Sequence, residues 1–113
     1  MKPALLIIDM QRYFMAEAPD VFRQKLLPNI ECLLSLFRSS DVPIVHVITR
    51  YSEDKSDWPL PCRDQDSIWC LSGTEGAEVL PEAAPLPGEP VVVKTRYSAF
   101  YRTELETRVW THS

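Results

Sequence analysis

Short, uninterrupted apolar runs punctuate this chain, separated by stretches of mixed polarity. Residues 4–8 are all apolar, and the runs at residues 43–48 and 90–93 are apolar except for His46. Runs without polar alternation are typical of strands that are covered on both faces, as in the middle of a parallel sheet. We therefore predict three strands, at residues 4–9, 43–50 and 90–94.

The pattern becomes helical between the first two strands. Four apolar residues have the spacing i, i+3, i+4 and i+7 of one helix face, namely Ile30, Leu33, Leu34 and Phe37. Pro28 suits the first position of this helix, where its missing N–H costs nothing, and residues 39–41 would end it. We expect a short helical turn at residues 21–27 and a loop at residues 12–20. A strand, a helix and a strand in this order predict a βαβ unit with a right-handed crossover.

The segment between the second and third strands, residues 51–89, has no clear periodicity. Six of the ten prolines lie between residues 59 and 90, so we predict a loop-rich connection with one short helix at residues 74–80. A long connection in a small domain is commonly functional, and we expect it to form a pocket wall. After the third strand, Thr103 and Glu106 match a capping box, which predicts a helix from about Glu104.

Composition excludes several classes of protein. The 113 residues suffice for one small domain, and 45% hydrophobic with 25% charged residues is an ordinary globular mixture. A net charge of −4 and the absence of any basic run argue against nucleic-acid binding. The apolar runs are too short to span a membrane, and the N-terminus does not have the pattern of a signal peptide. We expect a cytoplasmic protein.

The cysteines and the central histidine have ordinary interpretations. Cys32, Cys62 and Cys70 are odd in number and lack CxxC spacing, which disfavours a disulfide framework and a zinc site. We expect each to be a small buried or half-buried hydrophobic side chain. His46 is either a packed, hydrogen-bonded histidine or a ligand, and the lack of a second His or Cys at a useful spacing favours the first.

Two charged residues, Asp9 and Lys94, each follow an apolar strand. Asp9 could simply cap the following turn. However, ligands bind in the crevice outside the carboxyl ends of parallel strands, and both residues would face that crevice if the strands lie close together. The pair could then exchange protons with a bound molecule. A structural ion pair that ties two strand ends together is the alternative.

Three segments in the right order resemble the isochorismatase-like hydrolases, a family that includes nicotinamidases, N-carbamoylsarcosine amidases and isochorismatase. They are ALLIIDMQRYF at residues 4–14, GTEGAE at residues 73–78 and VVVKTRYSAFYRTEL at residues 91–105. The resemblance implies an α/β fold, a three-layer αβα Rossmann-like parallel sheet in the order 3-2-1-4-5-6. Only the first three strands are present in residues 1–113, which we therefore expect to form a single, incomplete domain.

The resemblance also implies a chemistry, the hydrolysis of an amide or related C–N bond by an Asp-Lys-Cys triad. Asp9 would be the general base, and Lys94 would orient it and stabilise charge. The family's cysteine follows a fourth strand, and none of the three cysteines here matches it. We expect an N-terminal portion or a shortened relative that is inactive alone. Isochorismatase itself works on a vinyl ether without the cysteine, but the strands missing here also build its pocket.

The remaining expectations concern ligands and partners. We expect no metal and no cofactor, because the family's Asp-x-His metal arrangement lacks its histidines after the second strand here. The substrate would be a small molecule, and candidate residues for its binding are Gln11, Phe14, Trp58 and Tyr97; Trp69 is a further candidate pocket aromatic. An exposed first strand would make the chain a homo-oligomer or dependent on a partner. A non-catalytic small-molecule-binding or protein-interaction module is the alternative function.

Overall fold

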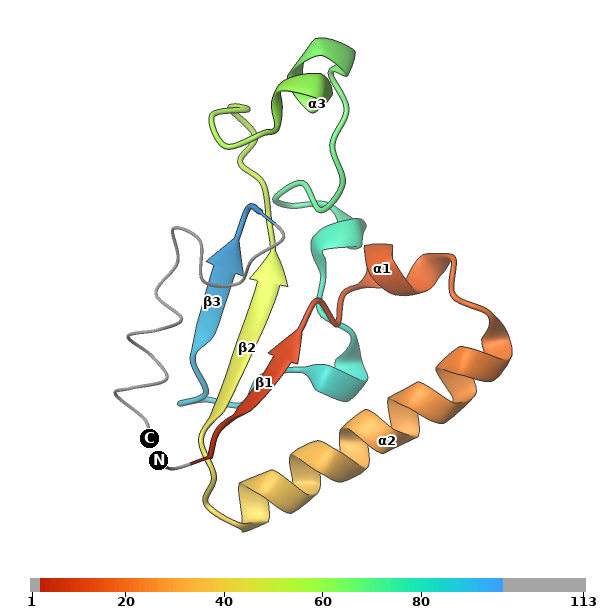
Figure 1. Ribbon diagram of the computed structural model, residues 1–113, viewed down its shortest axis with the longest axis vertical. Coiled ribbons are helices and arrows are strands. Elements are labelled where there is room, and N and C mark those ends of the chain that lie inside the picture. Colours follow the sequence, from red (N-terminus) through yellow and green to blue (C-terminus); the bar gives the residue numbers. More distant parts are fainter. Residues whose placement is uncertain (1–2, 97–113) are drawn as a thin grey trace.

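The computed structural model describes residues 3–96, which form a parallel three-stranded sheet flanked by helices (Figure 1). The strands are β1 (Leu5–Ile8), β2 (Ile44–Thr49) and β3 (Val91–Lys94), in the order β1-β2-β3. Leu5 pairs with Ile44, and Thr49 pairs with Lys94. The predicted α/β class, parallel pairing and strand order 3-2-1 are confirmed. All six residues of β2 are buried, as expected for a central strand.

The crossover helix α2 (Asp20–Ser39) is one continuous helix of 20 residues. The prediction of a short turn followed by a new helix at Pro28 was wrong, because Pro28 lies inside α2. A proline within a helix costs about 3 kcal/mol. Apolar side chains on both sides of Pro28, Leu27 and Ile30 among them, pack against the same core cluster. Packing of one continuous face therefore overrides the local preference.

The first turn after β1 also differs from the expectation. Residues 12–16 of the predicted loop form a short helix, α1 (Arg12–Ala16), which packs against the 3-10 turn η1 (Glu75–Ala77). The predicted helix at residues 74–80 is reduced to η1. Val79 forms an antiparallel bridge with Gln11, and Leu80 N–H donates to Met10 O at 2.9 Å. The backbone of residues 78–80 is thus extended, because its hydrogen bonds go to the chain after β1.

The rest of the long connection holds two further short elements. Helix α3 (Leu60–Gln65) projects beyond the carboxyl ends of the strands (Figure 1), and the 3-10 turn η2 (Pro81–Ala83) packs against α2. The main core lies between one face of the sheet and α2 with η2; its buried members are Ile7, Met10, Leu34, Ile44, Leu80 and Ala83. A smaller cluster of Val45, Val47 and Val92 occupies the other face.

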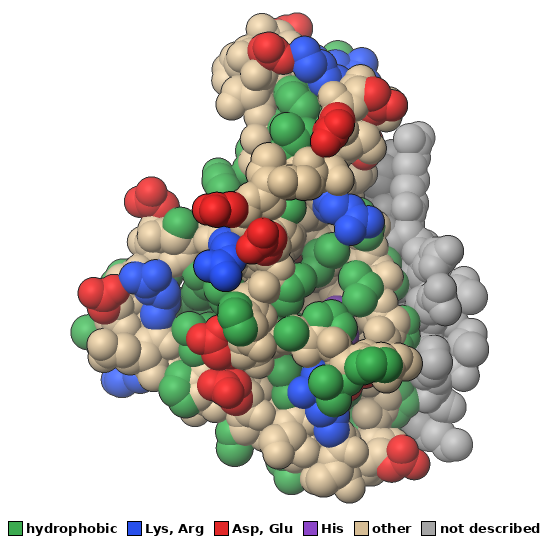
Figure 2. All heavy atoms as spheres, turned by 180° about the vertical axis from the view of Figure 1, so that it is seen from behind, with side chains coloured by type: hydrophobic (Ala, Val, Ile, Leu, Met, Phe, Trp, Pro, Cys, Tyr) green, Lys and Arg blue, Asp and Glu red, His purple; other side chains and the backbone are tan. Residues whose placement is uncertain are grey.

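Charged side chains of both signs are mixed on the one face that Figure 2 shows. Figure 2 shows acidic and basic side chains interspersed among hydrophobic ones on the face seen from behind. No helix within residues 3–96 is long and apolar enough to cross a membrane. The helix predicted from Glu104 lies outside the described residues.

Candidate active site

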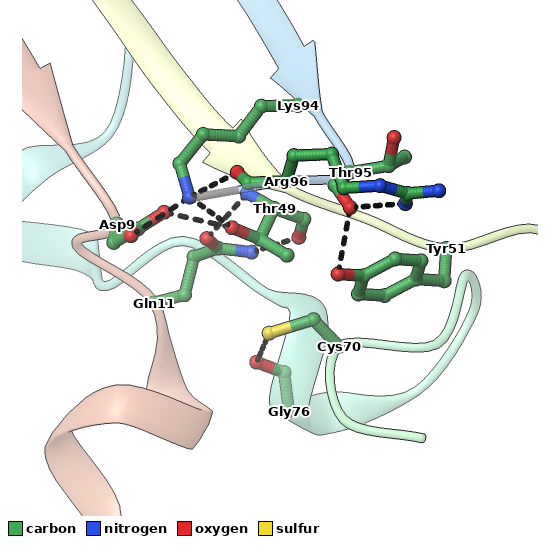
Figure 3. A network of polar contacts seen from close by, with 9 residues as sticks. All are labelled: Asp9, Gln11, Thr49, Tyr51, Cys70, Gly76, Lys94, Thr95 and Arg96. Atoms are coloured by element: carbon green, nitrogen blue, oxygen red, sulfur yellow. Dashed lines mark hydrogen bonds and ion pairs between the residues drawn. The ribbon is translucent and has the colours of Figure 1, made fainter. Parts of the chain in front are cut away.

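Asp9, Thr49 and Lys94 meet at the carboxyl ends of the three strands (Figure 3). The Lys94 ammonium lies 3.2 Å from Asp9 Oδ2. Thr49 Oγ1 donates to Asp9 Oδ1 at 2.9 Å, and Lys94 Nζ donates to Thr49 Oγ1 at 3.0 Å. β1 and β3 are not neighbours, so Lys94 reaches Asp9 across the end of β2. The charged pair is therefore a three-member cluster, with the threonine in the middle.

The backbone at Asp9 is in the left-handed region, with φ +57°. Non-glycine residues seldom adopt this conformation, although aspartate tolerates it better than most. Two short bonds hold it in place: Asp9 N–H donates to Val47 O, and Gln11 N–H donates to Asp9 O, both at 2.9 Å. The chain thus turns immediately after β1, and the carboxylate is directed toward Lys94 (Figure 3).

Gln11 extends the sheet with its side chain. Its amide donates to Thr49 O at 2.7 Å and accepts from Thr49 N–H at 2.9 Å, as a neighbouring strand would do. The same amide donates to Ala77 O at 2.9 Å. The Gln11 side chain is completely buried and does not line the cavity described below. The structure therefore places this predicted substrate-binding residue behind the cluster, where it holds the end of β2.

A cavity of about 640 Å³ opens over the cluster. Asp9, Thr49 and Lys94 belong to its polar lining, and its aromatic walls are Phe14, Tyr51 and Trp69. The remaining lining residues are Pro59, Leu60, Pro61, Cys62, Thr95 and Arg96. The long connection does form a pocket wall, as expected from its length. A mainly apolar cavity with a few convergent polar groups is the usual form of a small-molecule site.

The aromatic candidates have different positions. Phe14 and Trp69 line the cavity, and Trp69 packs edge-to-face on Tyr51 with ring centroids 5.9 Å apart. Trp58 does not line the cavity: it is buried, and its indole N–H donates to Ser52 O at 2.7 Å. Tyr97 lies outside the described residues.

Sequence reasoning missed Thr49 and Tyr51. Tyr51 donates its hydroxyl to Thr95 O at 3.0 Å, and burial raises the pKa of this phenol. Thr49 could have been found from its position, because it is the polar residue that ends β2 just as Asp9 and Lys94 end the flanking apolar runs.

The cysteines occupy three environments. Cys32 is exposed on α2, so the expectation of a buried or half-buried side chain was wrong for it; it lies off the apolar stripe. Cys62 is half-buried in the cavity wall. Cys70 is buried, and burial together with the negative charge of Asp9 raises the pKa of its thiol to about 11, despite the opposing effect of Lys94. Cys70 is therefore a protonated thiol at neutral pH.

No group of three or more His, Cys, Asp or Glu side chains within residues 3–96 could hold a metal ion. The two aspartates after β2 have local roles. Asp54 accepts hydrogen bonds from Ser56, and Asp57 accepts them from Ser52. They stabilise turns in the connection.

Comparisons with known proteins show the family of this chain. The model of the isochorismatase domain family matches residues 3–110, and the chain belongs to this family. It is 33% identical to an isochorismatase family protein of Desulfovibrio vulgaris with a TM-score of 0.79, covering 96% of this chain and 60% of that one. For the N-carbamoylsarcosine amidase of Thermoplasma acidophilum the identity is 29% and the TM-score 0.77, covering 98% of this chain and 62% of that one.

Among curated proteins, the phenazine biosynthesis protein PhzD of Pseudomonas fluorescens is 29% identical over 108 residues, which are 96% of this chain and 52% of PhzD. A probable isochorismatase of Pseudomonas chlororaphis is 28% identical over the same proportions. The chain spans about half the length of these relatives. The aligned half contains the segments that carry Asp9 and Lys94.

Proposed function

We propose that Asp9 and Lys94 correspond to the acid–base part of the family's hydrolase site, whose complete form acts on an amide or related C–N bond of a small molecule. The observation that carries this proposal is their position in the polar part of an aromatic-walled cavity at the carboxyl ends of parallel strands. Asp9 would take a proton from the nucleophile and return it to the leaving group. The Lys94 ammonium, 3.2 Å away, would orient the carboxylate and offset its charge.

The nucleophile is the missing part of this proposal. In the family it is a cysteine that follows a fourth strand, and none of the three cysteines of this sequence stands there. Cys62 lines the cavity but lies in the connection after β2, and the raised pKa of Cys70 leaves its thiol uncharged. We therefore propose that residues 1–113, a single incomplete domain, bind a small molecule without turning it over.

A substrate screen tests this proposal. The purified chain would be incubated with small amides, such as nicotinamide and N-carbamoylsarcosine, and with the vinyl ether isochorismate. We expect no turnover, but saturable binding that perturbs the NMR signals of Phe14 and Trp69 and is lost in Asp9→Asn. Glu17→Gln, an exposed carboxylate change on the chain after α1, is the matched control. Turnover that depends on Asp9 and resists thiol reagents would contradict the proposed inactivity. Binding unaffected by Asp9→Asn would contradict the site.

An interaction through β1 is the second candidate function. Within residues 3–96, β1 pairs only with β2, and Ile8 is 44% exposed. An apolar edge strand without charged residues is a template for another strand. We expect oligomers whose mass, measured by light scattering, rises with concentration, and we expect Ile8→Lys to shift them toward monomer. A monomer with a sharp melt that does not depend on concentration would contradict this candidate.

A further inference from the structure

We propose that Thr49 is a positioning residue of this site, which accepts a hydrogen bond from the Lys94 ammonium and fixes the orientation of the Asp9 carboxylate. The inference rests on the proposed function of the Asp9–Lys94 pair. Its starting point is that the Thr49 hydroxyl, in a residue only 3% exposed, contacts both charged groups at once. No other described side chain does so.

The direction of each hydrogen bond follows from the chemistry of the groups. An ammonium can only donate, and an ionised carboxylate can only accept. The Thr49 hydroxyl must therefore accept from Lys94 and donate its single proton to Asp9 Oδ1. A side chain that only donates or only accepts could not occupy this place. Valine, which has the same shape as threonine, lacks both capacities.

The hydroxyl is one of two hydrogen-bond acceptors of the Lys94 ammonium within residues 3–96. Three oxygens lie within reach of Nζ: Asp9 Oδ2 at 3.2 Å, Thr49 Oγ1 at 3.0 Å and Arg96 O at 3.3 Å (Figure 3). Thr49 Oγ1 and Arg96 O accept hydrogen bonds from Nζ, and Asp9 Oδ2 forms an ion pair with it. Asp9 accepts a hydrogen bond from Thr49 on Oδ1 and is paired with Lys94 through Oδ2, and it lines the cavity. The carboxylate is therefore open to a ligand's proton from the cavity.

Thr49 is itself held from behind. Both its backbone N–H and its C=O are bound by the Gln11 amide, which also binds Ala77 O. On its other side, Thr49 pairs with Lys94 in the sheet. The β-branched side chain of threonine has few rotamers, so a fixed backbone also fixes the hydroxyl. Gln11, Thr49 and the charged pair thus form one connected unit.

NMR on the full chain tests the inference without requiring turnover. We expect the ammonium protons of Lys94 and the hydroxyl proton of Thr49 to exchange slowly with water in the wild type. Thr49→Val removes the shared bond, and we expect the Lys94 protons to exchange about tenfold faster, the equivalent of one hydrogen bond. Thr49→Ser keeps the hydroxyl and should restore slow exchange. Thr74→Val, which removes an exposed hydroxyl elsewhere, is the matched control.

The outcomes separate a positioning role from a structural one. If Thr49→Val lowers only the melting temperature and leaves Lys94 exchange unchanged, the hydroxyl does not hold the ammonium and the inference is wrong. If Thr49→Val does not fold, the wild type decides: a Thr49 hydroxyl proton that exchanges rapidly and shows no coupling to the Asp9 carboxylate overturns the proposal. These signals do not depend on a ligand. If the chain binds no small molecule, slow exchange of the Lys94 and Thr49 protons is still expected. Conversely, fast exchange of these protons would contradict the role of Thr49 without contradicting a role of Asp9 in ligand binding.

Discussion

Two charged clusters each include a residue of the central strand β2, and they differ in what surrounds them. His46 in the middle of β2 contacts Glu89, with 2.9 Å between Nε2 and Oε1. Arg38 of α2 binds the same carboxylate through two bonds, of 2.7 and 2.8 Å. Three residues further along β2, Thr49 joins Asp9 to Lys94 beneath the cavity. His46 is a packed, hydrogen-bonded histidine, the alternative that its sequence context favoured.

The two clusters satisfy their carboxylates differently. Glu89 accepts from Arg38, His46 and the Leu86 N–H, so both its oxygens are used within the protein. Only Nδ1 of His46 is buried without a partner among the described residues. In the second cluster, the carboxylate borders the cavity, and 29% of its side-chain surface is exposed. A buried charge bonded on all sides fastens elements together, whereas one that borders a cavity remains available to a ligand.

Removing the Glu89 carboxylate should have the largest effect on the free energy of unfolding. Glu89→Ala leaves Arg38 and the buried His46 without their partner, and we expect a loss of about 3 kcal/mol in the free energy of unfolding. Urea denaturation measures this loss, with the exposed Glu17→Ala as control. A loss below about 1 kcal/mol, the range of surface ion pairs, would show that the Glu89 cluster does not stabilise the fold. The proposed difference between it and the Asp9–Lys94 cluster would then be wrong.

The pH dependence of stability should report on the same carboxylate. The hydrogen bond from Arg38 is the main cause that lowers the pKa of Glu89 from 4.5 to about 2. A carboxyl whose pKa is lower in the folded state stabilises the fold above its unfolded pKa, and this contribution is lost as pH falls through the folded pKa. We expect about 2 to 3 kcal/mol to disappear between pH 5 and 2. Urea midpoints measured across this range should fall less steeply in Glu89→Gln; equal slopes would contradict the assignment.

Gln11→Ala should affect the cluster of Asp9, Thr49 and Lys94 indirectly, because the Gln11 side chain binds the backbone of Thr49. Two buried backbone groups of Thr49 and the partly buried carbonyl of Ala77 would lose their partner. We expect a loss of about 2 kcal/mol and faster amide hydrogen exchange at Thr49, with Gln24→Ala on the exposed side of α2 as control. An unchanged rate of amide exchange at Thr49 would mean that the Gln11 side chain does not hold the end of β2 in place.

Variants of the charged pair should change stability least and in an asymmetric way. Lys94 is 6% exposed and Asp9 29%. Lys94→Met leaves a carboxylate that water can reach, and we expect a change below about 1 kcal/mol. Asp9→Asn leaves the ammonium buried, and we expect a loss of about 1 to 2 kcal/mol. Thermal unfolding of both variants measures the difference in stability. A larger loss of stability for Lys94→Met would contradict the expectation that the more buried partner, Lys94, depends more on the ion pair.

Helices were harder to predict from sequence than strands, for a physical reason. The strands came from continuous apolar runs, a local signal of burial on both faces. Pro28 within α2 and the extended residues 78–80 depend on partners distant in sequence: the core beneath α2 and the chain after β1. Trp58 and Phe14 looked equivalent in sequence, yet only Phe14 lines the cavity.

By itself the sequence determined the parallel strands, the family, and the placement of Asp9 and Lys94 at strand ends. These features follow from local patterns, namely continuous apolar runs that each end at a charged residue. Only the tertiary structure decided how these charges meet. Strands β1 and β3 are separated by β2, and the two charges approach each other at a left-handed turn at Asp9, with the Thr49 hydroxyl hydrogen-bonded to both. It also decided that Gln11 replaces a strand rather than facing the cavity. Such relations depend on distances across the fold, which spacing along the chain does not contain.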